Sequence, residues 1–201
     1  MIDLYLASGS PRRHALLTQL GVRFEVLRLR SAAPRTTDVD ELQHPGEAGH
    51  DYVERIAREK LEWGRAIVRR RGLVPRPILA ADTVVLLDGV VLGKPRDRAE
   101  AIRTLGQLSG RAHEVRTAVM LGANALHAAT SISRVFFRPL TATEIERHAD
   151  SDEPYDKAGG YAIQGRGALY AERIEGSYSG IMGLPLSETA RMLARAGVPL
   201  P

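Results

Sequence analysis

The sequence predicts an α/β fold built on a mixed β-sheet, and three observations lead to this prediction. Apolar runs of strand length alternate with helical patterns along the chain. The hairpin signal Asp88-Gly89 interrupts this alternation, and a hairpin joins antiparallel strands. The chain has 201 residues, of which 44% are hydrophobic and 26% charged, as is typical of globular proteins. A chain of this length forms one domain, or two lobes around a cleft.

The first half of the chain shows two strand patterns and two helical patterns. They cover residues 2–7 and 24–29 (strands) and residues 10–20 and 46–71 (helices). Ser10 followed by Pro11 is typical of a helix N-cap and first helical position, and Gly21 would end that helix. The stretch over residues 30–45, with prolines, threonines and several acidic residues, predicts a loop that could act as a mobile lid.

The second half is richer in strands. Strand patterns cover residues 78–87, 90–92, 113–121, 128–137, 161–163 and 168–174, and helical patterns cover residues 96–108, 141–150 and 186–196. Thr141 and Glu144 form a capping box at the start of one of these helices. The chain contains no internal repeat and no low-complexity linker, so nothing divides it into separate domains.

Composition excludes several classes of protein. The absence of cysteine excludes a disulfide scaffold, a Cys-based zinc or iron–sulfur site and a thiol nucleophile. The first residues lack the basic segment and apolar core of a secretion signal. No apolar run approaches the ~20 residues that span a bilayer. We therefore expect a soluble, cytoplasmic protein with no membrane partner.

The basic charge is weak evidence for a nucleic-acid partner. The chain carries 28 Lys+Arg against 24 Asp+Glu, but only three of the basic residues are lysines: Lys60, Lys94 and Lys157. So strong a preference for arginine indicates coding bias, and no block of five or six basic residues occurs. We expect no nucleic-acid partner. A lysine kept against such a bias is a candidate for chemistry that needs a compact positive charge.

The first candidate site is the segment Ala7-Ser8-Gly9-Ser10-Pro11-Arg12-Arg13. It places backbone N–H groups, a helix N-terminus and two guanidinium groups at the carboxyl end of a strand. Such an arrangement favours a bound anion, and guanidinium groups match phosphate oxygens. Cations at a helix N-terminus oppose the helix dipole by about 0.3–1 kcal/mol each, which argues for an anion that offsets them. The alternative is an ordinary capped helix with a basic first turn.

The second candidate is Asp82-Thr83, which interrupts an otherwise apolar strand. A carboxylate there requires a paired charge, hydrogen bonds or a metal ion. Lys94 follows the hairpin partner strand and could return near Asp82. Lys60 lies on the apolar face of its helix, where its ammonium either reaches the solvent edge or points into a cleft. A structural aspartate satisfied by the backbone remains the alternative.

The third candidate is the glycine-rich segment over residues 156–165, which includes Asp156, Lys157 and Gln164. Its glycines permit close approach of the backbone to a ligand, and the Gln164 amide offers both a donor and an acceptor to a nucleobase edge. A plain glycine-rich turn is the alternative. The chain lacks a Walker A loop, a dinucleotide fingerprint, a zincin motif and a nucleophile elbow, and its six histidines show no metal-ligand spacing.

Several segments together resemble the Maf family of nucleoside triphosphate pyrophosphatases. They occur in order from the first strand to the last helix: Leu6-Ala-Ser-Gly-Ser-Pro-Arg-Arg13, Ala57-Arg-Glu-Lys60, Ala80-Ala-Asp-Thr83, Gly93-Lys-Pro95, Leu108-Ser-Gly110, Asp156-Lys-Ala-Gly159, Ile163-Gln-Gly165 and Gly183-Leu-Pro-Leu186. The resemblance implies one domain over residues 1–201. It also implies an inosine-triphosphatase-like fold, in which helices flank a mixed, twisted sheet in two lobes around a cleft.

The resemblance also implies an activity and a set of site residues. The reaction is hydrolysis of a nucleoside triphosphate between its α- and β-phosphates with a divalent metal ion, Mg²⁺ or Mn²⁺. Polyphosphate contacts are assigned to Ser8, Arg12, Arg13, Lys60 and Lys94. Asp82 is the proton acceptor, and Glu41 acts with it in handling metal or water, so both are candidate metal ligands. Whether Asp82 is a base or a metal ligand stays open. The resemblance further implies a homodimer.

The substrate follows from positions that separate two branches of the family. The branch selective for 7-methyl-GTP tends to have Trp, Gln and Glu where this chain has Arg13, Thr83 and Gln164. The pattern of this chain is that of the branch acting on dTTP and UTP. The 4-carbonyl and N3–H of these bases match the Gln164 amide, whereas Glu would suit the donor-rich edge of a methylated guanine. Modified pyrimidine nucleotides are further candidates.

Two alternatives come from other classes. A non-catalytic nucleotide-binding regulator of cell division would agree with the family's association with septum formation. However, a pure binder has no use for Asp82, because a carboxylate beside a polyphosphate repels it. A nucleic-acid-binding protein would need exposed aromatics among its basic residues, and aromatics make up only 5% of this chain.

The loop over residues 30–39 is longer and more basic than is usual in the family, which affects the placement of Asp40 and Glu41.

Overall fold

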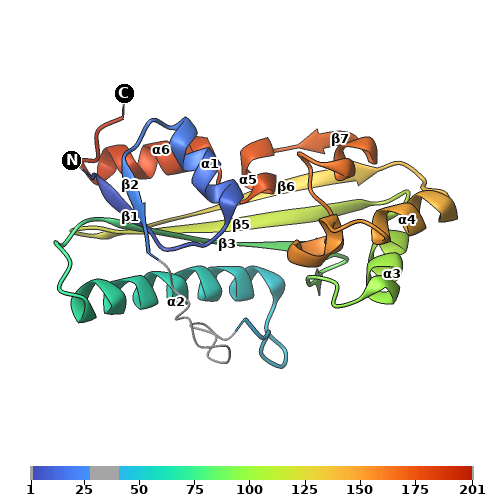
Figure 1. Ribbon diagram of the computed structural model, residues 1–201, viewed down its shortest axis with the longest axis horizontal. Coiled ribbons are helices and arrows are strands. Elements are labelled where there is room, and N and C mark those ends of the chain that lie inside the picture. Colours follow the sequence, from blue (N-terminus) through green and yellow to red (C-terminus); the bar gives the residue numbers. More distant parts are fainter. Residues whose placement is uncertain (1, 28–40, 201) are drawn as a thin grey trace.

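A computed structural model describes residues 2–27 and 41–200 of the chain, and its centre is a mixed β-sheet (Figure 1). In the described residues the sheet has seven strands in the order β2-β1-β3-β5-β6-β7, with β4 paired to β3. The strands are β1 (Leu4–Leu6), β2 (Phe24–Val26), β3 (Ile78–Leu87), β4 (Val90–Leu92), β5 (Ala112–Gly122), β6 (Leu126–Phe137) and β7 (Ala171–Glu175). Strand β1 is parallel to β2 and β3, and the other pairs are antiparallel. The predicted mixed sheet is therefore confirmed.

Helices cover both faces of the sheet. They are α1 (Pro11–Gln19), α2 (Gly49–Arg70), α3 (Arg98–Leu108), α4 (Ala142–Ala149), α5 (Tyr178–Met182) and α6 (Leu186–Arg195). Helix α2 packs on one face, and α1 and α6 lie on the other (Figure 1). Helices α3 and α4 pack together at the far end of the long strands. None of the helices in the described ranges is long and apolar enough to cross a membrane.

Alternation along β3 decides which side chains face which helices. Ile78, Ala80 and Val84 pack with α2, whereas Leu79 and Ala81 pack with the core beneath α1 and α6. Because successive side chains of a strand point to opposite faces, Asp82 lies on the α2 side and Thr83 on the other.

Short partners leave the middle of one edge of β3 uncovered. Strand β5 follows the other edge of β3 from Ile78 to Leu86. On the open edge, β1 pairs with β3 only at Ile78 and Leu79, and β4 begins only opposite Val85. The backbone between these two partners, which includes Asp82 and Thr83, therefore borders a gap in the sheet.

The capping and turn predictions are confirmed. Ser10 caps α1 with Pro11 at its start, and Thr141 and Glu144 form the capping box of α4. Both residues of the Asp88-Gly89 turn have positive φ, at 51° and 81°, as a type I′ turn requires.

Three predictions about secondary structure are wrong. The strand predicted over residues 168–174 begins only at Ala171, because Arg166–Leu169 forms a short 3₁₀ helix. Residues 161–163 do not form a strand. They belong to an irregular stretch between the short 3₁₀ helices η2 (Ala158–Gly160) and η3 (Arg166–Leu169). In place of a neighbouring strand, the side chain of Glu153 accepts hydrogen bonds from the backbone N–H groups of Ala162 and Gly167. The second long helix begins at Gly49 rather than at residue 46, where Gly46 has a φ of 75°. Most of the predicted lid, with Asp40, lies outside the described residues.

Candidate active site

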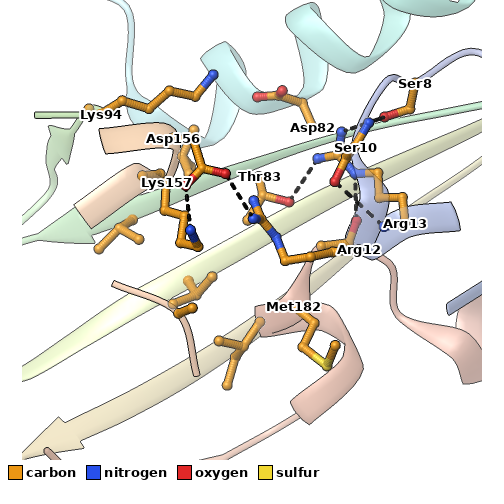
Figure 2. A pocket seen from close by; sticks show the side chains of 18 of the residues that line it. Ser8, Ser10, Arg12, Arg13, Asp82, Thr83, Lys94, Asp156, Lys157 and Met182 are labelled. Carbon is orange, nitrogen blue, oxygen red and sulfur yellow. Dashed lines mark hydrogen bonds and ion pairs between the residues drawn. The ribbon is translucent and has the colours of Figure 1, made fainter. Parts of the chain in front are cut away.

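One cavity of about 830 Å³ collects the residues that the sequence singled out (Figure 2). Its lining includes all eleven predicted site residues: Ser8, Arg12, Arg13, Glu41, Lys60, Asp82, Thr83, Lys94, Asp156, Lys157 and Gln164. The three segments proposed as separate candidate sites therefore form a single site. Its position follows from the gap along β3, because β1, β4 and the glycine-rich segment all end around that gap.

Lys60 lies at the centre of a cluster of charges. Its Nζ is 2.7 Å from Asp82 Oδ1 and 2.8 Å from Glu41 Oε1. The Lys60 and Asp82 side chains are each 13% exposed, so the ammonium points into the cleft rather than to the solvent edge. Lys94 Nζ is 3.6 Å from the second oxygen of Glu41. The antiparallel register of β4 carries the chain from Leu92 back toward Thr83 and so explains how Lys94 reaches this cluster.

Tyr52 is a member of this cluster that sequence reasoning missed. Its hydroxyl donates a hydrogen bond to the backbone carbonyl of Glu41 at 2.7 Å and so ties the start of the described loop to α2. Burial, with the charges of Asp82 and Glu41, raises the pKa of Tyr52 to about 12, so the hydroxyl remains a donor at neutral pH. Tyr52 precedes Lys60 by two steps of four residues, a spacing that places both on one helix face and that could have identified it.

The carboxylates of Glu41 and Asp82 fit a divalent cation that arrives with a phosphate ligand. In the described residues no group of three or more His, Cys, Asp or Glu side chains could hold a metal ion alone. Mg²⁺, however, is commonly bound by one or two carboxylates together with substrate phosphates and waters. Lys60 occupies one oxygen of each carboxylate, and Asp82 Oδ2 has no contact in the described structure.

Arg13 is buried and held on the opposite face of β3. Its Nε donates to the Gly183 carbonyl at 2.8 Å, and one Nη donates to Thr83 Oγ1 at 3.1 Å. Thr83 Oγ1 lies 2.9 Å from Thr117 Oγ1, which in turn donates to the carbonyl of Gly180 at 2.7 Å. Because a carbonyl oxygen can only accept, the proton of Thr117 points to Gly180, and Thr83 must therefore donate its own proton to Thr117. This relay fixes the direction of the guanidinium.

The charge of Arg13 has no anionic partner of its own in the described ranges. Burial lowers the pKa of its guanidinium, and the charge of Asp82 opposes this effect from a distance. The guanidinium has five N–H groups, of which three are used by Gly183, Ser8 and Thr83. The remaining two can donate to an anion in the cavity.

Ser8 presents a hydroxyl proton in a similar way. Its Oγ accepts hydrogen bonds from the backbone N–H of Ser10 at 3.3 Å and from Arg13 Nη1 at 3.3 Å. With both lone pairs engaged and only 6% of the residue exposed, the hydroxyl proton is left for a ligand. Ser8 thus supports the interpretation of residues 7–13 as an anion site rather than as a merely capped helix.

A second polar chain joins α1 to the glycine-rich segment (Figure 2). Arg12 Nη1 is 3.4 Å from Asp156 Oδ2, and the other oxygen of Asp156 pairs with Lys157 Nζ. The hydrogen bonds from Lys157 and Arg12 outweigh burial and hold the pKa of Asp156 below its usual value. Lys157 also donates to the backbone carbonyl of Glu153 at 2.9 Å. Asp156 therefore positions two cations, and its role as a direct substrate contact stays a prediction.

Glu153 is the second residue that sequence reasoning missed. Its carboxylate accepts hydrogen bonds from the backbone N–H groups of Ala162, Arg166 and Gly167. The signal that could have identified it is a carboxylate just before the glycine-rich segment, where backbone N–H groups without strand partners need acceptors. Gln164 lies within the stretch that Glu153 holds, and its side chain lines the cavity without a hydrogen bond in the described structure.

The similarity of this chain to known proteins identifies its family. The Maf family, described as Maf-like protein, matches residues 3–196. A protein of Bordetella avium (strain 197N) named dTTP/UTP pyrophosphatase is 55% identical over 199 residues, which cover 98% of this chain and 97% of that protein. A protein of the same name from Cupriavidus pinatubonensis is 54% identical over 196 residues, covering 96% of each chain.

Among solved structures, a nucleoside-triphosphatase / dITP/XTP pyrophosphatase from Mycobacterium abscessus has a TM-score of 0.44 and 17% identity, covering 98% of this chain and 95% of that one. This likeness is too weak to support an argument. The family match, in contrast, spans nearly the whole chain, and the two relatives described above are more than 50% identical to it over the aligned residues. The chain therefore belongs to the Maf family.

Proposed function

We propose that this protein is a pyrophosphatase that hydrolyses dTTP and UTP between their α- and β-phosphates. The products are the nucleoside monophosphate and pyrophosphate. The observation that carries this proposal is the meeting of five cationic side chains with the Asp82–Glu41 pair in one cavity. The names of the two relatives described above support the same substrates.

The cations account for binding of the triphosphate. The cavity lining holds five cationic side chains and three carboxylates: Arg12, Arg13, Lys60, Lys94 and Lys157 against Glu41, Asp82 and Asp156. A triphosphate carries about four negative charges, which cations must offset before a nucleophile can approach. The backbone and hydroxyl donors at the start of α1 add hydrogen bonds of the kind that helix N-termini offer to phosphate. We assign the polyphosphate to this end of the cavity.

Asp82 is the group suited to act on the attacking water. Lys60 fixes one carboxylate oxygen by a 2.7 Å contact, which leaves Oδ2 to accept a proton or to position the water. The water oxygen forms the new bond to phosphorus, the bond to the bridging oxygen breaks, and the proton of the water passes to Asp82. A divalent cation held by Glu41 and Asp82 would neutralise phosphate charge when bound.

Gln164 is the group suited to read the base. Its amide has one donor and one acceptor side, which match the 4-carbonyl and N3–H of thymine and uracil. The branch of the family that is selective for the alternative substrate, 7-methyl-GTP, tends to have Trp and Gln where this chain has Arg13 and Thr83. These two residues contact each other at 3.1 Å, so the Arg13–Thr83 pair behaves as one unit of the site. Because this chain has both residues in the pattern of the dTTP/UTP branch, their identity supports the pyrimidine substrates.

The proposal also covers the metal ion, the location and the oligomeric state of the protein. We infer Mg²⁺ or Mn²⁺ as the metal ion, a cytoplasmic location, a homodimer and one domain over residues 1–201. No nucleic acid or membrane is needed by this activity, and a role in septum formation would be additional to it.

Pyrophosphate release from a panel of nucleoside triphosphates tests the proposal. We expect turnover of dTTP and UTP that needs Mg²⁺ or Mn²⁺ and stops when EDTA removes the metal. Purified protein that binds these nucleotides with the metal present, yet releases no pyrophosphate from any of them, would overturn the enzymatic proposal in favour of a nucleotide-binding regulator.

A further inference from the structure

We propose that Glu153 is a positioning residue for base selection. Its carboxylate holds the loop over residues 162–167, and the position of this loop decides between a pyrimidine with a 4-carbonyl and one with a 4-amino group. The inference rests on the proposed function, because it concerns the base of the same nucleotide.

The contacts of Glu153 define a clamp on the loop. Its Oε1 accepts from the backbone N–H groups of Ala162 at 3.0 Å and Gly167 at 3.2 Å, and its Oε2 accepts from that of Arg166 at 2.8 Å. The clamp thus joins both ends of the loop to one carboxylate. Burial alone would raise the pKa of Glu153, but the three N–H groups outweigh it and lower the pKa, so the carboxylate stays charged at neutral pH.

Two glycines make room for the clamp. A Cβ atom on Gly165 would lie 2.5 Å from Glu153 Oε2, and one on Gly167 would lie 2.6 Å from the carbonyl oxygen of Ala162. Both separations are shorter than any ordinary contact. Gly165 is therefore required by the approach of the Glu153 carboxylate, and Gly167 by the approach of the loop's own backbone.

The side chain of Gln164 cannot by itself tell the two kinds of base apart. Its amide can turn over, so that it pairs with O4 and N3–H of uracil in one orientation and with the 4-amino group and N3 of cytosine in the other. Backbone N–H groups cannot be reversed in this way. Those of Ile163 and Gln164 form no hydrogen bond in the described structure and remain available as donors, which favour a carbonyl over an amino group.

Glu153 also links this loop to the cationic end of the cavity. Its backbone carbonyl accepts a hydrogen bond from Lys157, which pairs with Asp156, which in turn contacts Arg12. The short 3₁₀ helix η1 (Glu153–Asp156) therefore positions both the loop over residues 162–167 and one of the cations proposed to hold phosphate. A variant that changes only the carboxylate of Glu153 leaves the backbone part of this link in place.

The Glu153→Gln variant tests the inference. A carboxamide can accept at one side of the clamp but presents an NH₂ group to an N–H group at the other, so the loop should shift. Binding of the α,β-imido analogues of dTTP and dCTP, measured by calorimetry with Mg²⁺, gives a selectivity ratio. We expect this ratio to fall about tenfold, the effect of one misplaced polar contact. Gly165→Ala, which displaces the same carboxylate, should lower the ratio in the same direction.

Two further measurements separate positioning from a general loss of structure. The dissociation constant of inorganic tripolyphosphate, which has no base, measured by the same calorimetry, should stay within about twofold of wild type. Glu172→Gln is the matched control, because Glu172 is exposed, does not line the cavity and forms no side-chain hydrogen bond or salt bridge in the described structure. It should leave the selectivity ratio unchanged.

The outcomes are distinct from those of the proposed function. An unchanged ratio in Glu153→Gln, or equal losses for both analogues and tripolyphosphate, would overturn the positioning role. A lower selectivity ratio in Gln164→Ala than in Glu153→Gln would also overturn it, because the side chain of Gln164, and not the position of the loop, would then select the base. Because binding is measured without turnover, the ratio is defined even for a protein that hydrolyses no nucleotide, in which case the proposed function alone fails.

Discussion

The substitution Asp82→Asn should separate catalysis from binding and folding. Asparagine has the shape of aspartate but cannot take up a proton from water. General-base catalysis contributes about 10²–10⁴-fold to a rate, which corresponds to about 3–5 kcal/mol of activation free energy. We expect kcat for dTTP to fall by that factor.

The structure predicts a much smaller effect on the free energy of unfolding. Lys60 keeps its contact with Glu41 at 2.8 Å, and the amide oxygen of the variant can still accept from Lys60. One weakened hydrogen bond is worth about 1 kcal/mol, so Tm should change by no more than about 4 °C. Nucleotide affinity measured in EDTA, without the metal ion, should be unchanged or higher, because a carboxylate that repels phosphate has been removed.

Three assays on the same preparation decide the matter: pyrophosphate release, calorimetric titration with α,β-imido-dTTP and thermal unfolding. Asp51→Asn is the matched control, because Asp51 is an exposed aspartate at the start of α2 outside the cavity, and it should retain wild-type turnover. The reasoning is refuted by an Asp82→Asn variant that retains kcat within tenfold of wild type. It is equally refuted by one that loses turnover and metal-free binding together.

Three more predictions follow from other parts of the site and the core. Gln164→Glu should gain hydrolysis of 7-methyl-GTP and lose that of dTTP, as a nucleotide panel would show; no change in preference would contradict the assignment of Gln164. Thr83→Val should lower the free energy of unfolding by about 1–3 kcal/mol in denaturant titrations, because it strands a donor of Arg13; an effect near zero would mean that water replaces the relay. Burial lowers the pKa of His113 to about 4, so its contribution to stability is complete above pH 6.5 and is lost as pH falls toward 4. We therefore expect Tm to decrease less between pH 6.5 and pH 4 in His113→Gln than in wild type or in His50→Gln, a control at an exposed histidine. The same decrease of Tm in all three proteins would contradict this.

The helix caps and the hairpin were predictable because they depend on neighbours in sequence. Ser10 with Pro11, and Thr141 with Glu144, satisfy backbone groups within a few residues of themselves. The short helix α5 was not predicted, because its five residues are held by a serine cap and a left-handed glycine at Gly183 rather than by an apolar periodicity. Caps and turns can therefore be predicted from neighbouring residues, whereas a short helix that only its two ends stabilise is much harder to predict.

The site residues were predictable for a different reason. Asp82 interrupts an apolar strand and Lys60 an apolar helix face, and each exception is explained by the other once α2 packs on β3. The residues that were missed act through the backbone. Tyr52 binds the carbonyl of Glu41, and Glu153 binds three N–H groups, so neither carries a pattern that identifies its partner. A contact to a backbone atom leaves no signal in the sequence of the partner residue, because any residue there offers the same N–H or carbonyl group.

The alternation of β3 explains why the carboxylate of Asp82 and the guanidinium of Arg13 line one cavity without pairing. Asp82 and Thr83 are neighbours in sequence, yet one faces Lys60 on α2 and the other faces Arg13 on α1. A shift of one residue in the β3–β5 register would exchange them and present a hydroxyl to Lys60 and a carboxylate to Arg13. Arg13 would then form a buried ion pair and lose the two N–H groups that are left for an anion. The unbroken pairing of β3 with β5 from Ile78 to Leu86 excludes this shift. It is therefore this long antiparallel pair, which touches no substrate in our proposal, that keeps Arg13 without a carboxylate and available to phosphate.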